Sequence, residues 1–199
     1  MTSPIHNAPQ PYDLSNFTVL VVEDSTYMQS LMSSMLKIFG VGDIIICADS
    51  NEAADLLTIM QARSKSRYVN SVDIILTDWL MPNGSGEELL KWVRNHKKDA
   101  VRFLPIIVVS GYTTEKLTHV TRDMGANEIL VKPISGTMVA SRICSIIDKP
   151  RPFIKATGFF GPDRRRQDMA FTGENRRSKN PDIVEMEACK KLKKTMIIR

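Results

Sequence analysis

The chain has 199 residues, of which 43% are hydrophobic and 25% are charged, and this composition suits one soluble globular domain with an extension. No apolar run approaches the roughly 20 residues that a membrane-spanning helix requires, and the N-terminal sequence lacks the basic and apolar parts of a signal peptide. The three cysteines are widely spaced and odd in number, which argues against a disulfide framework or a zinc site and predicts a reducing, cytoplasmic location.

The net charge of +5 is unevenly distributed along the chain. Residues 149–199 contain 14 Lys or Arg and 6 Asp or Glu, whereas residues 1–148 contain 13 and 16. The basic character therefore belongs to the C-terminal part. An argument from charge to a nucleic acid or another acidic partner concerns that part alone.

Periodic structure begins after a proline-containing segment, residues 1–16, which predicts a flexible N-terminal arm. Short apolar runs predict buried strands at 18–22, 43–48, 73–77, 105–109 and 128–131. Apolar residues spaced by three and four predict helices at 28–39, 51–65, 87–95, 114–124 and 135–147. This alternation predicts an α/β domain over residues 17–148, a (βα)5 doubly wound parallel sheet covered on both faces.

Polar side chains directly follow four of the five predicted strands. Glu23 and Asp24 follow the first strand, Asp78 the third, Ser110 the fourth and Lys132 the fifth. Ligands of open parallel sheets bind outside the carboxyl ends of the strands. The sequence therefore predicts that three carboxylates, a hydroxyl and an ammonium group converge at one edge of the sheet.

This set of groups favours phosphoryl transfer with a magnesium ion. Clustered carboxylates repel one another unless a positive charge neutralises them, and oxygen ligands suit Mg²⁺. A hydroxyl and an ammonium group can donate hydrogen bonds to a phosphoryl group. Asp78 lies on the central strand and is the natural nucleophile. Taken singly, each residue is more often a helix cap or a surface residue, so the prediction rests on their conjunction.

Four segments resemble the receiver domain of bacterial two-component systems: VLVVEDS, DIILTDWLMPNGSGEEL, PIIVVSG and GANEILVKP, spread over residues 18–134. The resemblance implies the flavodoxin-like strand order 2-1-3-4-5. It also implies a response regulator that receives a phosphoryl group from a sensor histidine kinase or a phosphotransfer protein. Such a phosphoprotein catalyses only its own phosphoryl transfer and acts by binding a downstream protein target near its fourth and fifth helices.

The resemblance assigns roles to the carboxylates Glu23, Asp24 and Asp78, and we call the edge of the sheet where they are expected to meet the acidic edge. Asp78 would be the phosphoacceptor and a metal ligand. Glu23 and Asp24 would hold the metal directly or through water. The backbone carbonyl of Leu80 would supply a further metal oxygen.

The same resemblance assigns roles on the phosphoryl side of the site. Ser110 would donate a hydrogen bond to the phosphoryl group, and Lys132 would pair with one of its oxygens. Pro133 would follow a cis peptide bond. Pro82 and Gly86 would shape the loop beside the acceptor.

Three positions depart from the family pattern. Ile129 stands where the family often has a Tyr or Phe that swings inward on activation. Leu80 and Tyr112 occupy two positions that tune the loss of the phosphoryl group, and neither side chain can position a hydrolytic water. We therefore expect a long-lived phosphorylated state.

The basic extension, residues 149–199, carries no motif of secure function. Arginines and aromatics between Arg151 and Arg166 could bind nucleic acid or an anionic partner, but the composition favours a disordered segment. Residues 182–196 have the charge pattern of one short amphipathic helix. A nucleic-acid regulator, a phosphatase and an unphosphorylated scaffold are the alternative functions, and homodimerisation is left open.

Overall fold

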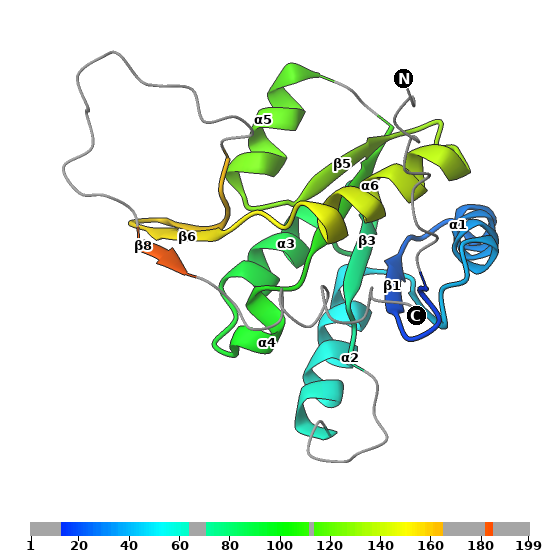
Figure 1. Cartoon of the computed structure of the whole chain (residues 1–199), viewed down its shortest axis with the longest axis horizontal. Helices are drawn as coiled ribbons and strands as arrows, with labels where there is room; N and C mark the ends of the chain where they lie inside the picture. The colour runs from blue at the N-terminus through cyan, green and yellow to red at the C-terminus, as the bar shows by residue number, and fades with distance from the viewer. Residues whose placement is uncertain (1–12, 64–70, 112–113, 165–181, 185–199) are drawn as a thin grey trace, which may run out of the picture.

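The structure is a computed structural model that describes residues 13–63, 71–111, 114–164 and 182–184. A five-stranded parallel sheet forms the centre of the molecule, and three short antiparallel strands form a second sheet at one end (Figure 1). Within the described part of the chain, no helix is long and apolar enough to cross a membrane.

The parallel sheet has the predicted strand order, β2-β1-β3-β4-β5. Its strands are β1 (Thr18–Val22), β2 (Asp43–Cys47), β3 (Ile74–Asp78), β4 (Ile106–Ser110) and β5 (Glu128–Val131). Every residue of β1, β3 and β4 is buried, because helices cover these strands on both faces. The second strand is partly exposed and lies at an edge of the sheet, as predicted.

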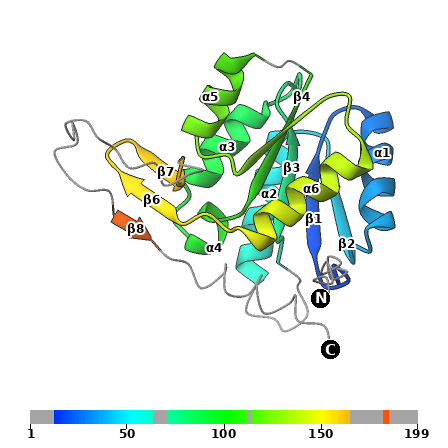
Figure 2. The same ribbon diagram turned by 45° about the horizontal axis from the view of Figure 1, so that its top comes forward.

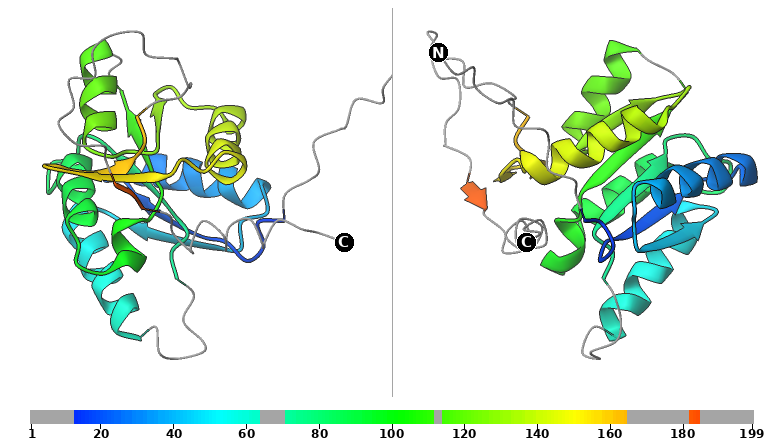
Figure 3. Two further views of the ribbon diagram at one scale, coloured as in Figure 1. Left: turned by 60° about the vertical axis from the view of Figure 1, so that its left-hand side comes forward. Right: turned by 45° about the vertical axis from the view of Figure 1, so that its right-hand side comes forward.

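Helices cover the sheet in two layers. They are α1 (Thr26–Ile38), α2 (Ser50–Arg63), α3 (Gly86–Arg94), α4 (Asp99–Arg102), α5 (Glu115–Asp123) and α6 (Gly136–Asp148). Figure 3 shows α1 and α6 on one side of the sheet and α2, α3 and α5 on the other. Each side has its own hydrophobic cluster, so the sheet separates two halves of the core.

Side-chain caps fix where the helices begin. Ser25 caps α1 by accepting a hydrogen bond from the backbone of Met28, and Ser85 and Glu88 form a capping box at the start of α3. The helix α3 therefore begins one residue before the predicted position. The sequence did not predict α4, because four residues are too few to produce a periodic pattern.

The folded domain begins earlier than the predicted boundary at residue 17. Leu14 is buried in the core cluster beneath α1, and its carbonyl accepts hydrogen bonds from the backbone of Phe17 and Gly42. The backbone at Ser15 passes so close to Gly42 that a Cβ there would overlap the Ser15 carbonyl. Residues 13–16 therefore belong to the domain rather than to the predicted arm, of which residues 1–12 lie outside the described part.

The extension is also more ordered than predicted. Strands β6 (Phe153–Ala156) and β7 (Phe159–Pro162) form an antiparallel hairpin, and β8 (Asp182–Val184) pairs with the other edge of β6. The expectation of a disordered segment at 151–164 was wrong, and the predicted helix at 182–196 begins instead as a strand. A free helix of that length would be marginal in water, whereas β6 offers residues 182–184 a pairing edge. Residues 185–196 lie outside the described part.

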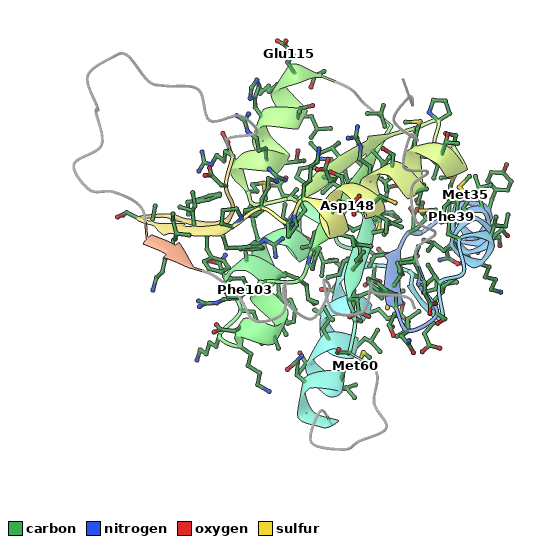
Figure 4. All side chains as sticks on the ribbon, viewed as in Figure 1. Met35, Phe39, Met60, Phe103, Glu115 and Asp148 are labelled. Atoms are coloured by element: carbon green, nitrogen blue, oxygen red, sulfur yellow. The ribbon has the colours of Figure 1, made fainter. Side chains whose placement is uncertain are left out.

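Aromatic packing joins the hairpin to the domain. Phe153 is 3% exposed and contacts Phe103 and Phe160, with ring centroids 4.8 and 5.5 Å away. Phe103, labelled in Figure 4, follows α4. Gly161 lies so close to Gly125 that a Cβ on Gly161 would be 2.7 Å from the Gly125 Cα. The hairpin is therefore part of the folded domain.

A buried arginine organises this end of the domain. The guanidinium of Arg94 donates hydrogen bonds to the backbone carbonyls of Gly125, Arg102 and Leu104 and to the Asn127 side chain, at 2.7 to 2.9 Å. It also lies 5.2 Å from the ring centre of Phe153. Figure 2 shows the three short strands beside α3 and α4. The hairpin thus covers the end at which β4 and β5 begin, opposite the acidic edge.

Candidate functional site

The three carboxylates predicted to converge do lie together. Carboxylate oxygens of Glu23, Asp24 and Asp78 are all within 4.8 Å of one another. Glu23 and Asp24 follow β1, and Asp78 ends the neighbouring strand β3. Glu23 and Asp78 are 1% and 7% exposed, whereas Asp24 is exposed. One buried side of the cluster is therefore fixed by the sheet, and the other side opens to solvent.

Lys132 joins this cluster from the end of β5. Its Nζ lies 2.7 Å from Asp78 Oδ2 and 2.9 Å from Glu23 Oε2. Its backbone N–H donates to the Ser110 carbonyl at 2.7 Å, which ties the ends of β4 and β5 together. The peptide bond between Lys132 and Pro133 is cis, as the resemblance implied.

The surroundings shift the pKa values of two of these groups, Glu23 and Lys132. Burial raises the pKa of Glu23, and the negative charge of Asp78 adds to this, against the lowering effect of Lys132. Burial alone would lower the pKa of Lys132, but its hydrogen bonds and its attraction to Asp78 and Glu23 outweigh burial and raise it. The ammonium therefore stays charged and compensates the crowded carboxylates.

The structure also places the other two predicted residues beside the cluster. Ser110 is the last residue of β4 and is buried, in register with Val131. Leu80 lies two residues after Asp78, and its backbone N–H is 3.4 Å from Asp78 Oδ1. Leu80 is 57% exposed and belongs to neither of the two core clusters. Tyr112 lies outside the described residues.

The helix-cap interpretation of the Glu-Asp pair does not hold, because Ser25 caps α1. Two supporting residues were missed by the sequence analysis. Gln29 donates from Nε2 to the Glu23 carbonyl at 2.6 Å, and the Thr77 hydroxyl donates to the Asp78 carbonyl at 3.0 Å. Neither belongs to a charged pattern, so no sequence signal distinguished them from ordinary helix and strand residues.

Close backbone packing requires glycine at position 86. A Cβ at this position would lie 2.1 Å from the carbonyl oxygen of Asp78, and the Gly86 N–H donates to the Trp79 carbonyl. The start of α3 therefore presses against the backbone of the acidic strand end. A side chain here would push Asp78 out of place.

The donor set fits a hard divalent cation. Three carboxylates offer oxygen ligands, and one ammonium offsets only part of their charge, so a cation would relieve the remaining repulsion. One partly exposed side leaves room for water or a ligand oxygen, which Mg²⁺ usually retains. The residues therefore suit Mg²⁺ better than a soft metal, which would prefer sulfur or imidazole.

We expect the thiol of Cys47, at the end of β2, to resist alkylation. Burial, reinforced by the nearby carboxylates of Glu52 and Asp49, raises its pKa to about 12. The reactive thiolate is therefore almost absent at pH 8. Peptide mapping after iodoacetamide treatment should show Cys47 unmodified in the native protein and modified in urea. Rapid native labelling of Cys47 would contradict its burial.

Comparison with known proteins gives a family match. Residues 19–143 match the family model described as response regulator receiver domain. A chemotaxis protein CheY homolog of Campylobacter jejuni is 31% identical over 131 residues, which cover 65% of this chain and 91% of the relative. Chemotaxis protein CheY-3 of Vibrio cholerae is 24% identical, with coverage of 67% and 94%.

The fold of this chain is also similar to that of solved structures. The receiver domain of the histidine kinase CKI1 from Arabidopsis thaliana, complexed with Mg²⁺ and BeF3⁻, has a TM-score of 0.60 and 28% identity. The match covers 68% of this chain and 93% of that one. A CheX-CheY-BeF3-Mg²⁺ complex from Borrelia burgdorferi has a TM-score of 0.54 and 25% identity, covering 65% and 88%.

Proposed function

Because this chain belongs to the response regulator receiver domain family, we propose that its phosphorylation takes place on Asp78 and that the acidic edge binds the Mg²⁺ required for it. The observation that supports this most strongly is the meeting of Glu23, Asp24 and Asp78 with Lys132 at one edge of the sheet. No other group of carboxylate, Cys or His ligands gathers in this way among the described residues.

The proposed reaction is an in-line transfer to the Asp78 carboxylate. A carboxylate oxygen forms the new bond to phosphorus as the bond from phosphorus to the donor breaks, and the bonding pair leaves with the donor. Lys132, already 2.7 Å from Asp78, would donate to a phosphoryl oxygen, and the Ser110 hydroxyl would donate to another. These groups position the phosphoryl group and offset its charge.

The metal would be held by the carboxylates of Glu23, Asp24 and Asp78 and by the backbone carbonyl of Leu80. When bound, Mg²⁺ would neutralise negative charge on the acceptor and on the phosphoryl oxygens. Gln29 and Thr77 would keep the backbone of this edge fixed through their hydrogen bonds. Two solved relatives are complexes with Mg²⁺ and BeF3⁻, and this likeness supports the assignment.

The partners are proposed from the family. A sensor histidine kinase or a phosphotransfer protein would supply the phosphoryl group, and a downstream protein would bind the face formed by α5, β5 and α6. The chain would thus act as a phosphorylation-controlled interaction switch rather than an enzyme with an external substrate. Glu23 and Asp24, the carboxylates beside Asp78, are assigned to the metal, so a phosphatase acting on external substrates would need an acid or base besides them.

We expect phosphorylation to depend strictly on Mg²⁺. Without the cation, the approach of an anionic donor to three carboxylates is repelled, so little modification should occur. The measurement is the intact mass of the full chain after incubation with acetyl phosphate, in Mg²⁺ and in excess chelator, followed by peptide mapping. The proposal would be overturned if the protein gained as much mass with chelator as with Mg²⁺, or if the phosphoryl group were found on another residue.

A further inference from the structure

One edge of the parallel sheet is open. The strand β2 comes first in the order β2-β1-β3-β4-β5, and no described strand pairs with its outer side (Figure 2). Residues 44–46 of this strand are all isoleucine, and Ile46 is 41% exposed and belongs to neither core cluster. An exposed apolar strand edge of this kind offers unpaired N–H and C=O groups to another chain.

The hydrogen bonds of β2 show which of its backbone groups face outward. Its end residues, Asp43 and Cys47, form backbone hydrogen bonds on the side of β1. Because the backbone groups of successive residues in a strand face opposite sides, the N–H and C=O groups of Ile44 and Ile46 point away from β1. Within the described part of the chain, none of these outward groups has a hydrogen-bond partner.

The opposite edge of the sheet is protected by charge. Along β5, the last strand, lie the guanidinium-bearing side chains of Arg122 and Arg142, and Glu128 belongs to the strand itself. Charged side chains at a strand edge discourage pairing with another chain. On β2 the only charged residue is Asp43, at one end, so residues 44–47 of the strand carry no such protection of their own.

From this pattern we infer that the chain forms a homodimer in which the β2 strands of two copies pair in antiparallel orientation. A two-fold axis beside Ile45 places Ile44 of each copy opposite Ile46 of the other. Each of these opposed pairs exchanges both of its backbone hydrogen bonds, so every outward N–H and C=O group of both copies is paired. The contact is self-complementary, as in most symmetric dimers.

Only this register satisfies the open edge. A shift by one residue places outward groups opposite residues whose own backbone groups bond to β1. A shift by two residues brings Gly42 or Ala48 opposite an isoleucine. The N–H of Gly42 already donates to the Leu14 carbonyl at 3.0 Å. The N–H of Ala48 already donates to Glu52 Oε2 at 2.6 Å. The flanking residues therefore limit the pairing to positions 44 and 46.

The side chains suit the same register. Opposed residues of an antiparallel pair point to the same face of the sheet, so the exposed Ile46 packs against Ile44 of the second copy. The two Asp43 carboxylates lie at opposite ends of the contact, about 14 Å apart along the strands, where salt screens their repulsion. The acidic edges of the two copies face opposite directions, so the contact leaves both open. Because the contact is small, we expect a weak, concentration-dependent dimer.

The first test is sedimentation equilibrium of the full, unphosphorylated chain between about 10 and about 500 μM, a range suited to a small interface. We expect the average mass to rise from that of one chain toward that of two. Ile46→Lys should raise the dissociation constant at least about tenfold, because it places two ammonium groups about 7 Å apart across the axis. Ile183→Lys, on the short strand β8 and 66% exposed, is the matched control and should leave it unchanged. A single-chain mass throughout the range, or equal effects of the two substitutions, would rule out the dimer.

Cysteine cross-linking tests the register and keeps the inference testable if Ile46→Lys destabilises the fold. In the proposed dimer, Ile45 faces its own counterpart with Cα atoms about 4.5 Å apart, within the range that a disulfide spans. The Cα atoms of Ile44 in the two copies are about 8 Å apart, which is too far. Both side chains are half-buried, so the two positions are matched. After mild oxidation, Ile45→Cys should yield dimers linked through position 45, and Ile44→Cys should not link through position 44. Equal linkage of the two variants, or dimers joined through the native cysteines alone, would reject this pairing.

Discussion

Replacement of Asp78 by asparagine is expected to abolish phosphorylation of the chain. The amide has no charged oxygen to attack phosphorus, and it weakens the metal site by removing one of three carboxylates. The intact mass after treatment with acetyl phosphate and Mg²⁺ should therefore remain that of the unmodified variant. Asp55→Asn, at an exposed position on α2, is the matched control and should be phosphorylated like the natural chain.

This variant should also remain folded. Loss of the Asp78 charge relieves repulsion within the acidic cluster, and Lys132 keeps its contact with Glu23 at 2.9 Å. We expect the free energy of unfolding in urea to be unchanged or raised. A folded Asp78→Asn protein that still gains a phosphoryl group would show that another residue is the acceptor.

Replacement of Phe153 by alanine is expected to lower the free energy of unfolding by about 3–5 kcal/mol. The ring is almost fully buried between Phe103, Phe160 and the Arg94 guanidinium, so its removal leaves a cavity and uncovers a buried cation. Urea unfolding followed by circular dichroism measures the change. The effect is large because the extension behaves as part of the domain.

Phe159 provides the control for this experiment. It lies on the neighbouring strand β7, is half-buried, and has the Arg164 guanidinium 4.0 Å from its ring centre. Phe159→Ala should cost about 1 kcal/mol, as expected for a partly exposed site. If Phe153→Ala cost no more than this control, the hairpin would not be docked on the domain in solution.

The parallel sheet was predictable because its signals are local and repeated. Runs such as those of β1 and β4 are apolar at nearly every position, which indicates strands covered on both faces. The convergence of Asp78 and Lys132 followed from a topological rule, since the carboxyl ends of parallel strands lie at one edge. The chemistry of the site could therefore be inferred before any distance was known.

The hairpin could not be predicted in the same way. Its strands β6 and β7 have four residues each, and their stability comes from contacts with Phe103 and Arg94, which are distant in sequence. The hydrogen bond of Gln29 to Glu23 is likewise invisible without the fold. Local patterns predict elements, whereas these contacts depend on which surfaces the fold leaves uncovered.

Arg94 couples the unfolding of several helix ends at one end of the domain. Its single guanidinium satisfies carbonyls at the ends of α4 and α5 while the residue itself ends α3. Fraying of any one of these helix ends would leave a buried cation short of an acceptor, which is costly. The three helix ends and the hairpin above them therefore open together, as one cooperative unit, rather than singly.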